Sequence, residues 1–110
     1  MPQLTFRGVA QGALASVIGP LVAELADICE CGLDNFTVDL METVPIYGGE
    51  GTASYPFAEA AWFERGDDAR DRFAEAVTRH LRAAGVAELE LAFKVYREEM
   101  YYINGRPCGS

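Results

Sequence analysis

The sequence is short of positive charge. It has 9 Lys and Arg residues against 17 Asp and Glu residues, which gives a formal net charge of −8 at pH 7. Nucleic acids and anionic membranes both bind proteins through clustered Lys and Arg, so this composition argues against either partner. A small anionic ligand would therefore have to be held by a local group of cations rather than by the overall field.

Metal-binding chemistry is also scarce. The chain has three cysteines, Cys29, Cys31 and Cys108, and a single histidine, His80. The pair Cys29-x-Cys31 would need two further ligands to form a closed metal site. We therefore expect no metal and no cofactor, and free thiols of the kind found in a reducing cytoplasm.

Long hydrophobic runs are the third feature that we do not find. The sequence predicts no apolar stretch of the roughly 18 residues that a membrane span needs, and no signal peptide after Met1-Pro2-Gln3. We therefore expect no membrane span and a cytoplasmic location. The 110 residues, half of them apolar, are enough for one domain with its own core, residues 1–110.

Two kinds of hydrophobic spacing alternate along the chain. Alternation, which is typical of half-buried strands, occurs in three segments: residues 3–9, 36–44 and 89–95. Residues 56–63 predict a further strand, which is made of small and aromatic residues. Spacing of three and four residues, which is typical of helices, occurs in two segments: residues 12–30 and 67–85. The predicted order is β-α-β followed by β-α-β.

Several residues predict where these elements begin, end or turn. Pro20 inside the first helix predicts a kink or a restart, because proline lacks an N–H group. Gly32 and Gly85 predict the two helix ends, and an aspartate after Gly66 predicts an N-cap. Asn104-Gly105 predicts a two-residue hairpin turn.

The two halves of the chain resemble each other. Pro2 and Pro56 lie 54 residues apart, as do Tyr47 and Tyr101. We interpret the chain as two β-α-β units, residues 1–54 and 55–110, that share one core because neither unit buries its sheet face and helix well alone. The predicted fold is a mixed α/β (α+β) fold with one four-stranded sheet and two helices on one face. Physics alone leaves a second arrangement open, the ferredoxin-like sandwich.

The motifs favour the first arrangement, because the sequence resembles the tautomerase superfamily of 4-oxalocrotonate tautomerase and macrophage migration inhibitory factor. The resemblance covers nearly the whole chain and is nearest to a little-characterised bacterial branch. The residues that carry it are Met1-Pro2-x-Leu4-x-Phe6-Arg7-Gly8, Tyr55-Pro56-Phe57-x-Glu59-x-x-Trp62-Phe63-x-Arg65-Gly66 and Tyr101-Tyr102-x-Asn104-Gly105.

The resemblance implies a catalytic role for Pro2. In this superfamily the proline after the initiator methionine is the catalytic base, and removal of Met1 would give Pro2 a free secondary amine. Burial lowers the pKa of such an amine toward neutrality, where a base moves protons best and needs no cofactor. Pro56 occupies the equivalent place in the second unit, but its nitrogen is an internal amide. The chain therefore holds at most one such base.

The resemblance also implies a cation that binds a small keto acid. Arg65 is the first candidate, because shorter family members carry a substrate-binding arginine in a similar setting. Arg7 is its counterpart in the first unit, although alternation along a strand directs it to the face opposite Pro2. Tyr101 and Tyr47 are candidates for the walls of the site. The stretch of residues 32–37 has no cation where some family members carry one.

The third predicted strand indicates self-association. Phe57, Ala61 and Phe63 lie on one of its faces, while small residues and Trp62 lie on the other. A strand that is apolar on both faces is buried on both faces, so a partner chain should cover the face without helices. We expect a homotrimer in which the hairpin at residues 101–105 reaches a neighbour.

Three functions remain open at this point. The first is a cofactor-independent tautomerase or isomerase-like enzyme that acts on a small keto acid or enol through Pro2. The second is a non-catalytic trimeric module with the same fold, and the third is a ferredoxin-like domain that binds a small ligand. The state of the N-terminus and the oligomeric state separate them.

Overall fold

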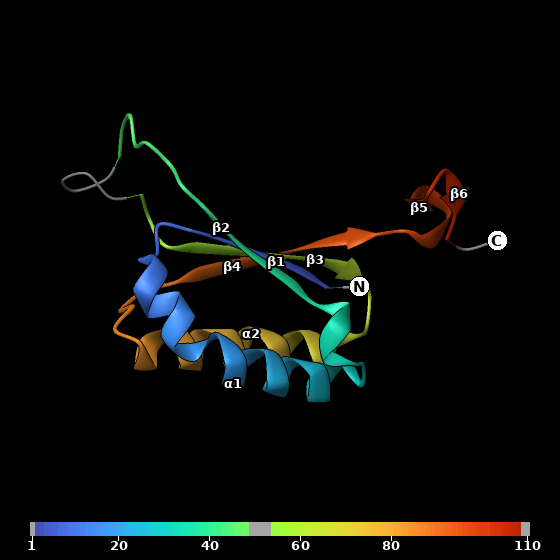
Figure 1. Cartoon of the computed structure of the whole chain (residues 1–110), viewed down its shortest axis with the longest axis horizontal. Helices are drawn as coiled ribbons and strands as arrows, with labels where there is room; N and C mark the ends of the chain where they lie inside the picture. The colour runs from blue at the N-terminus through green and yellow to red at the C-terminus, as the bar shows by residue number, and fades with distance from the viewer. Residues whose placement is uncertain (1, 49–53, 109–110) are drawn as a thin grey trace.

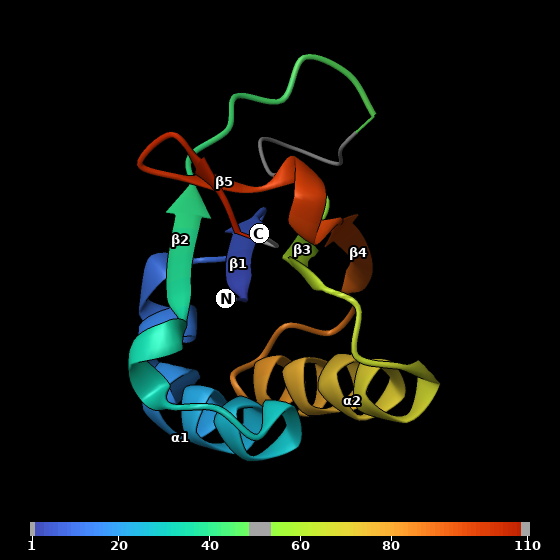
Figure 2. The same cartoon turned by 90° about the vertical axis from the view of Figure 1, so that its right-hand side faces the viewer.

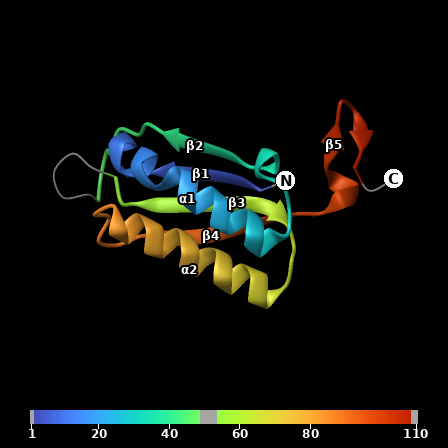
Figure 3. The same ribbon diagram turned by 60° about the horizontal axis from the view of Figure 1, so that its bottom comes forward.

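The chain forms one sheet backed by two helices (Figure 1) in a computed structural model that describes residues 2–48 and 54–108. Helices α1 and α2 run side by side across one face of the sheet and lie in front of it in Figure 3. The elements in chain order are β1 (Gln3–Arg7), α1 (Gln11–Cys29), η1 (Leu33–Asn35), β2 (Thr37–Met41), β3 (Phe57–Phe63), α2 (Asp67–Ala83), β4 (Glu90–Tyr96), η2 (Glu98–Met100), β5 (Tyr102–Ile103) and β6 (Arg106–Pro107).

The strand order confirms the two β-α-β units. The sheet runs β2-β1-β3-β4, with parallel pairs on the outside and an antiparallel pair, β1 and β3, in the middle. Each parallel pair is one unit, joined through its own helix. A ferredoxin-like sheet would instead place another strand between the two strands of each unit, so that alternative is excluded.

The core lies between the sheet and the helices. Leu4 and Phe6 of β1 and Trp62 of β3 point toward the helices and are at most 1% exposed. The Trp62 ring stacks on Phe93, with centroids 4.7 Å apart, and meets the edge of Phe73 at 5.1 Å. The alternation in the sequence therefore predicts correctly which residues of the two central strands face the helices.

The helix ends differ from two of the predictions. At Pro20, inside α1, the sequence predicted a kink or a restart; α1 continues past the exposed Pro20 ring with one backbone donor fewer, so the restart is excluded. Helix α1 ends at Cys29, and its C-cap is Glu30, which adopts φ 53°, rather than the predicted Gly32. Gly66 occupies the N-cap position of α2, so the aspartate cap was wrong. Gly85 does lie past the end of α2, with φ 96°.

Helix α1 also corrects the prediction about long apolar runs. Its 19 residues, with a mean hydropathy of 1.6, make it long and apolar enough by length and composition to cross a membrane. In this fold Leu21 and Leu25 of α1 are fully buried in the core. Because the core helix of a globular domain passes the same length and composition test, this property does not assign α1 to a membrane.

Two segments extend from the open face of the sheet, which is the face without helices. Residues 42–48, which we call the arm, rise at one end, and residues 101–108, the C-terminal hairpin, rise at the other (Figures 1 and 2). The radius of gyration is 14.9 Å, against about 13 Å for a compact chain of this length. The exposed apolar side chains of these two segments are Val44, Ile46, Tyr47, Tyr102 and Ile103, and Met100 of η2, just before the hairpin, is exposed as well.

The hairpin has the predicted turn. Asn104 and Gly105 both have positive φ, 51° and 81°, and connect β5 to β6. This is the conformation that a two-residue turn requires and that Asn-Gly adopts most easily.

The open face is less apolar than the sequence suggested. Phe57 and Phe63 are half-buried on it and Ala61 is 5% exposed, but Glu59 in the middle of β3 is exposed. The apolar patches therefore lie toward the two ends of β3.

Candidate active site

Pro2 lies at the start of the central strand β1, and its ring is less than 2% exposed. Its carbonyl oxygen accepts a hydrogen bond from the backbone N–H of Thr37, at 3.3 Å. Gln3 pairs with Ala61, so the antiparallel register places Pro2 beside Trp62 at the end of β3. Pro2 and Leu4 are both buried, while Arg7 is exposed, as the alternation along β1 predicts.

Arg65 lies at the same end of the sheet as Pro2. The guanidinium lies over the Trp62 ring, 5.7 Å from its centroid, and Nη1 donates to the carbonyl oxygen of Cys29 at 3.2 Å. Cys29 is the last residue of α1, so this cation meets the negative end of the helix dipole. Among residues 2–48 and 54–108, the guanidinium of Arg65 has no carboxylate partner, although the chain contains 17 acidic residues; only the backbone N–H of Arg65 meets a carboxylate, that of Glu64, at 3.1 Å.

Two buried N–H groups at this end find no acceptor within the part of the chain that the structure describes. They are Nε1 of Trp62 and Nε of Arg65. A buried donor without an acceptor costs free energy, so such groups are uncommon and often mark a functional position. A carboxylate or carbonyl oxygen is the type of group that both donors would bind.

Burial also affects the thiol of Cys29. Desolvation is the main cause that raises the pKa of Cys29, and the positive charge of Arg65 opposes it. The raised pKa favours the protonated thiol at neutral pH, which makes Cys29 a poor nucleophile.

Tyr101 connects the C-terminal hairpin to this end of the sheet. Its hydroxyl accepts a hydrogen bond from Nε2 of Gln3 at 3.4 Å. Its ring meets Phe63 edge-on, with centroids 5.1 Å apart, and lies 5.3 Å from the ring of Tyr96. Tyr101 is therefore held on the open-face side of the strand that begins at Pro2.

The structure places Arg7 and Tyr47 elsewhere. Arg7 ends β1, five residues after Pro2, so about 17 Å of strand separates the two. Tyr47 is 97% exposed on the arm. One chain thus brings Pro2, Arg65 and Tyr101 to one end of the sheet, and Arg7 and Tyr47 to the other.

The repeat explains this separation. The backbone N–H of Glu90 donates to the carbonyl of Pro56 at 3.2 Å, as that of Thr37 does to Pro2. Gly8 and Gly66 both follow the first strand of their unit with positive φ, 72° and 95°. Because β1 and β3 are antiparallel, equivalent residues of the two units lie at opposite ends of the sheet.

Gln3 is a part of this site to which nothing in the sequence pointed. Trp62 belongs to a stretch quoted for the family resemblance, and the sequence offers its indole as a wall or a hydrogen-bond donor of the site, as it does the tyrosines. Within the described residues, no group of three or more His, Cys, Asp or Glu side chains is placed to hold a metal ion.

The family comparison covers almost the whole chain. The family model described as "Domain of unknown function (DUF1904)" matches residues 1–107. No curated protein matches the sequence.

Two solved structures are similar in sequence as well as in fold. A crystal structure of a DUF1904 domain from Sebaldella termitidis is 29% identical, with a TM-score of 0.83 over 97% of this chain and 99% of the other. A protein of unknown function from Vibrio cholerae O1 biovar eltor is 28% identical, with a TM-score of 0.86 over 96% and 86% of the two chains.

More distant structures share the fold alone. A native fused 4-OT is 16% identical, with a TM-score of 0.77 over 97% of this chain and 96% of the other. Macrophage migration inhibitory factor from Toxoplasma gondii is 14% identical, with a TM-score of 0.64 over 96% and 97%. The fold is therefore that of the 4-OT and macrophage migration inhibitory factor superfamily, as the sequence resemblance implied.

Proposed function

This chain belongs to the DUF1904 family and has the tautomerase superfamily fold, and from these two facts we propose that it is a cofactor-independent tautomerase. Its substrate is a small keto acid or the corresponding enol. The observation that carries the proposal is Arg65, a half-buried cation at the Pro2 end of the sheet that has no carboxylate partner among the described residues. A substrate carboxylate is the natural partner for such a guanidinium.

The base in this proposal is the nitrogen of Pro2. Removal of Met1 turns that nitrogen from an amide into a secondary amine with a free lone pair. A site as apolar as the one that buries Pro2 disfavours the ammonium form and brings the pKa down toward neutrality. The amine then takes the proton of the enol hydroxyl and, as an ammonium, returns a proton to the neighbouring carbon. The enol becomes the keto acid, and the base is regenerated.

Arg65 and Trp62 hold the substrate during this transfer. The guanidinium binds the substrate carboxylate, and the buried Nε1 of Trp62 offers one more donor to an oxygen. Charge that develops on the enolate oxygen is stabilised by donors that are already in place. The Tyr101 ring, held by Phe63 and Tyr96, forms a wall on the open-face side.

We propose that the working unit is a homotrimer. Related folds include fused 4-OT structures described as an asymmetric trimer and as a symmetric trimer. In this chain the arm and the C-terminal hairpin present exposed apolar side chains beside the open face, and Ile46 is 91% exposed. Apolar segments of this kind are typical of subunit interfaces.

The burial of Pro2 favours a second candidate, a non-catalytic trimeric module. Its ring is less than 2% exposed and its carbonyl is bound by Thr37. If the native chain keeps Met1, the Pro2 nitrogen stays an amide and cannot act as a base. The mass of the N-terminal peptide from the native host distinguishes the two candidates.

The decisive experiment uses protein whose loss of Met1 has been confirmed by mass spectrometry. Ketonisation of phenylenolpyruvate is followed by absorbance for the wild type, Pro2→Ala and Pro56→Ala. Pro56 is the matched control, because it starts the equivalent strand but has an amide nitrogen. We expect Pro2→Ala to lose about 10²-fold or more in kcat/KM, within the range of general-base contributions, and Pro56→Ala to keep its rate. Equal activity of the wild type and Pro2→Ala would contradict the proposal.

A further inference from the structure

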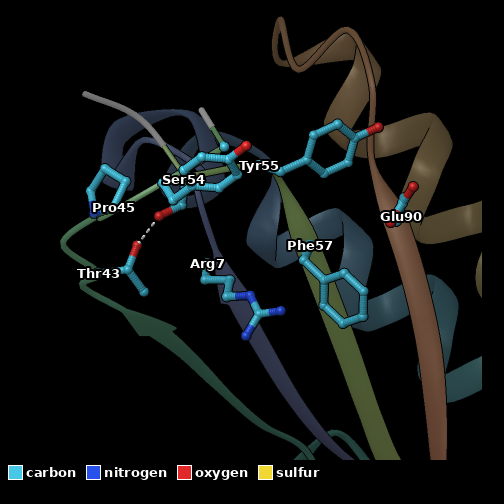
Figure 4. Close-up of a pocket in the computed structure, with 9 residues that line it drawn as sticks. Arg7, Thr43, Pro45, Ser54, Tyr55, Phe57 and Glu90 are labelled. Carbon is cyan, nitrogen blue, oxygen red and sulfur yellow. Dashed lines mark hydrogen bonds between the residues drawn. The ribbon is translucent and has the colours of Figure 1, made fainter. Parts of the chain in front are cut away.

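A hollow lies at the Arg7 end of the open face, where β1 ends and β3 begins (Figure 4). It encloses about 550 Å³, within the range of small-molecule sites. Arg7 pairs with Phe57, and Phe57 pairs with Glu90, so the three residues form one row across three strands. Neighbouring strands lie about 4.8 Å apart, which puts the backbones of Arg7 and Glu90 about 10 Å apart.

One side of this hollow is cationic. The Arg7 guanidinium lies over the Phe57 ring, with Cζ 4.8 Å from the centroid. Within the described ranges 2–48 and 54–108, Arg7 has no ion pair or side-chain hydrogen bond, although the chain carries a net charge of −8. Its N–H donors are therefore free to bind a carboxylate.

The other side of the hollow is anionic. Glu90 lines it from β4, and the Tyr55 hydroxyl donates to Oε2 of Glu88 at 3.3 Å. Desolvation, followed by the charges of Glu88 and Glu90, raises the pKa of Tyr55. A cation and an anion therefore flank the half-buried ring of Phe57. The hydroxyls of Thr43 and Ser54, joined at 2.6 Å, close a third side.

From this geometry we propose that the Arg7 hollow binds a zwitterionic amino acid with an apolar or aromatic side chain. The ligand carboxylate pairs with Arg7, its ammonium group pairs with Glu90, and its side chain lies against Phe57. A purely anionic ligand would meet Arg7 but also the charge of Glu90, and Glu59 lines a smaller hollow of about 340 Å³ beside Arg7. A zwitterionic amino acid offers a carboxylate to Arg7 and an ammonium group to Glu90, so both charged residues of the row gain a partner.

This site is independent of the proposed catalysis. It lies at the Pro56 end of the sheet, where the equivalent proline has an amide nitrogen, so it binds without supplying a base. The length of β1 separates it from Pro2. Binding here can therefore be measured in protein that retains Met1, and its failure would leave the tautomerase proposal untouched.

The test compares three probes by calorimetric titration of the full chain: L-phenylalanine, 3-phenylpropionate and phenethylamine. All three contain a phenyl group. L-phenylalanine carries both charges, 3-phenylpropionate carries only the negative charge, and phenethylamine carries only the positive charge. We expect L-phenylalanine to bind at least tenfold more tightly than either probe with one charge. Chemical-shift changes should centre on the amides of Arg7, Phe57 and Glu90.

Two variants test whether Arg7 and Glu90 each contact the bound amino acid. Arg7→Gln and Glu90→Gln should each weaken L-phenylalanine binding at least tenfold, which is the effect of one lost charge-assisted contact. Arg82→Gln, which removes an exposed arginine on α2, is the matched control and should bind like the wild type. Circular dichroism checks that each variant is folded.

Three results would overturn the inference. The first is no detectable binding of L-phenylalanine at millimolar concentration. The second is binding of 3-phenylpropionate that equals that of L-phenylalanine and is unaffected by Glu90→Gln, which would make this an anion site alone. The third is binding of L-phenylalanine that neither variant weakens, which would place it elsewhere on the chain.

Discussion

Nη1 of Arg65 donates to the carbonyl oxygen of Cys29 at 3.2 Å, and this contact ties the end of β3 to the last turn of α1. The carbonyl is one of the four that a helix leaves unpaired at its C-terminus. The same guanidinium lies over Trp62 at the Pro2 end of the sheet. One cation thus stabilises a helix end and presents free donors to the candidate active site.

Replacement of Arg65 should affect both stability and substrate binding. Arg65→Ala should lower the free energy of unfolding by about 1–2 kcal/mol, through loss of a charged hydrogen bond at a helix C-terminus. In the tautomerase assay it should raise KM more than it lowers kcat. Urea denaturation and steady-state kinetics measure the two effects, with Arg82→Ala as the control. If Arg65→Ala changes neither the unfolding free energy nor KM, Arg65 neither stabilises the end of α1 nor binds the substrate.

Trp62 should be the most sensitive single position in the core. Trp62→Ala leaves a cavity between Phe73 and Phe93 and should cost about 3–5 kcal/mol of unfolding free energy. Trp62→Phe keeps most of the ring contacts and removes the unpaired N–H group, so it should cost less than about 1.5 kcal/mol. Thermal and urea denaturation followed by circular dichroism measure both values. Equal losses for the two variants would show that ring packing is not the dominant contribution.

Gly8 and Gly12 form a matched pair for backbone strain. A Cβ atom on Gly8 would lie 2.5 Å from the carbonyl oxygens of Ser54 and Tyr55, and its φ is +72°. Gly8→Ala should therefore cost about 1–3 kcal/mol. A Cβ on Gly12 would meet nothing within 4 Å, and Gly12→Ala should raise stability by up to about 1 kcal/mol. A neutral Gly8→Ala would mean that this turn readily adopts another conformation.

The contact between α1 and α2 should depend on pH through Glu24. Hydrogen bonds from Arg79 and then His80 lower the pKa of Glu24 below its ordinary value of 4.5, and His80 Nε2 lies 2.9 Å from Glu24 Oε1. A lowered pKa gives stability that is present above pH 4.5 and is lost as the pH falls through the folded-state value. Glu24→Gln should therefore be less stable than the wild type at pH 7.

The difference in unfolding free energy between Glu24→Gln and the wild type should shrink as the solution is acidified below pH 4.5. Urea denaturation at pH 7 and at pH 3 measures it. Asp71→Asn is the matched control, an exposed carboxylate of α2 for which no ion pair is seen within the described residues, and it should show no such trend. A constant difference between Glu24→Gln and the wild type at both pH values would contradict this account.

The arm and the C-terminal hairpin should hold the assembly together. Ile46→Ser and Ile103→Ser, combined in one chain, remove two exposed apolar contacts and should shift the assembly toward monomer. Leu33→Ser, which changes an apolar residue that is 61% exposed in η1, should leave the assembly unchanged. Sedimentation equilibrium at micromolar concentration measures the mass. A wild-type protein that sediments as a stable 12.0 kDa monomer would reject the trimer.

The local structure was determined by the sequence itself. Alternation predicted three strands of the sheet and three-to-four spacing predicted both long helices, because hydrophobic periodicity follows directly from the geometry of each element. The short run of small and aromatic residues at 56–63 predicted the remaining strand, β3. Asn104-Gly105 predicted its turn for the same local reason. The repeat of Pro2 and Pro56 predicted two units, and the face on which Arg7 lies followed from simple alternation.

The composition of the site was decided by tertiary structure. Arg7 and Arg65 are counterparts in sequence, yet the antiparallel pairing of β1 with β3 sends them to opposite ends of the sheet. Arg65 donates to the backbone carbonyl of Cys29, 36 residues away in sequence. Every residue has a backbone carbonyl, so no sequence motif could identify this partner. Burial of Trp62 Nε1 without an acceptor is likewise a property of packing. Local patterns specify elements and faces, whereas strand order and long-range contacts specify which residues meet.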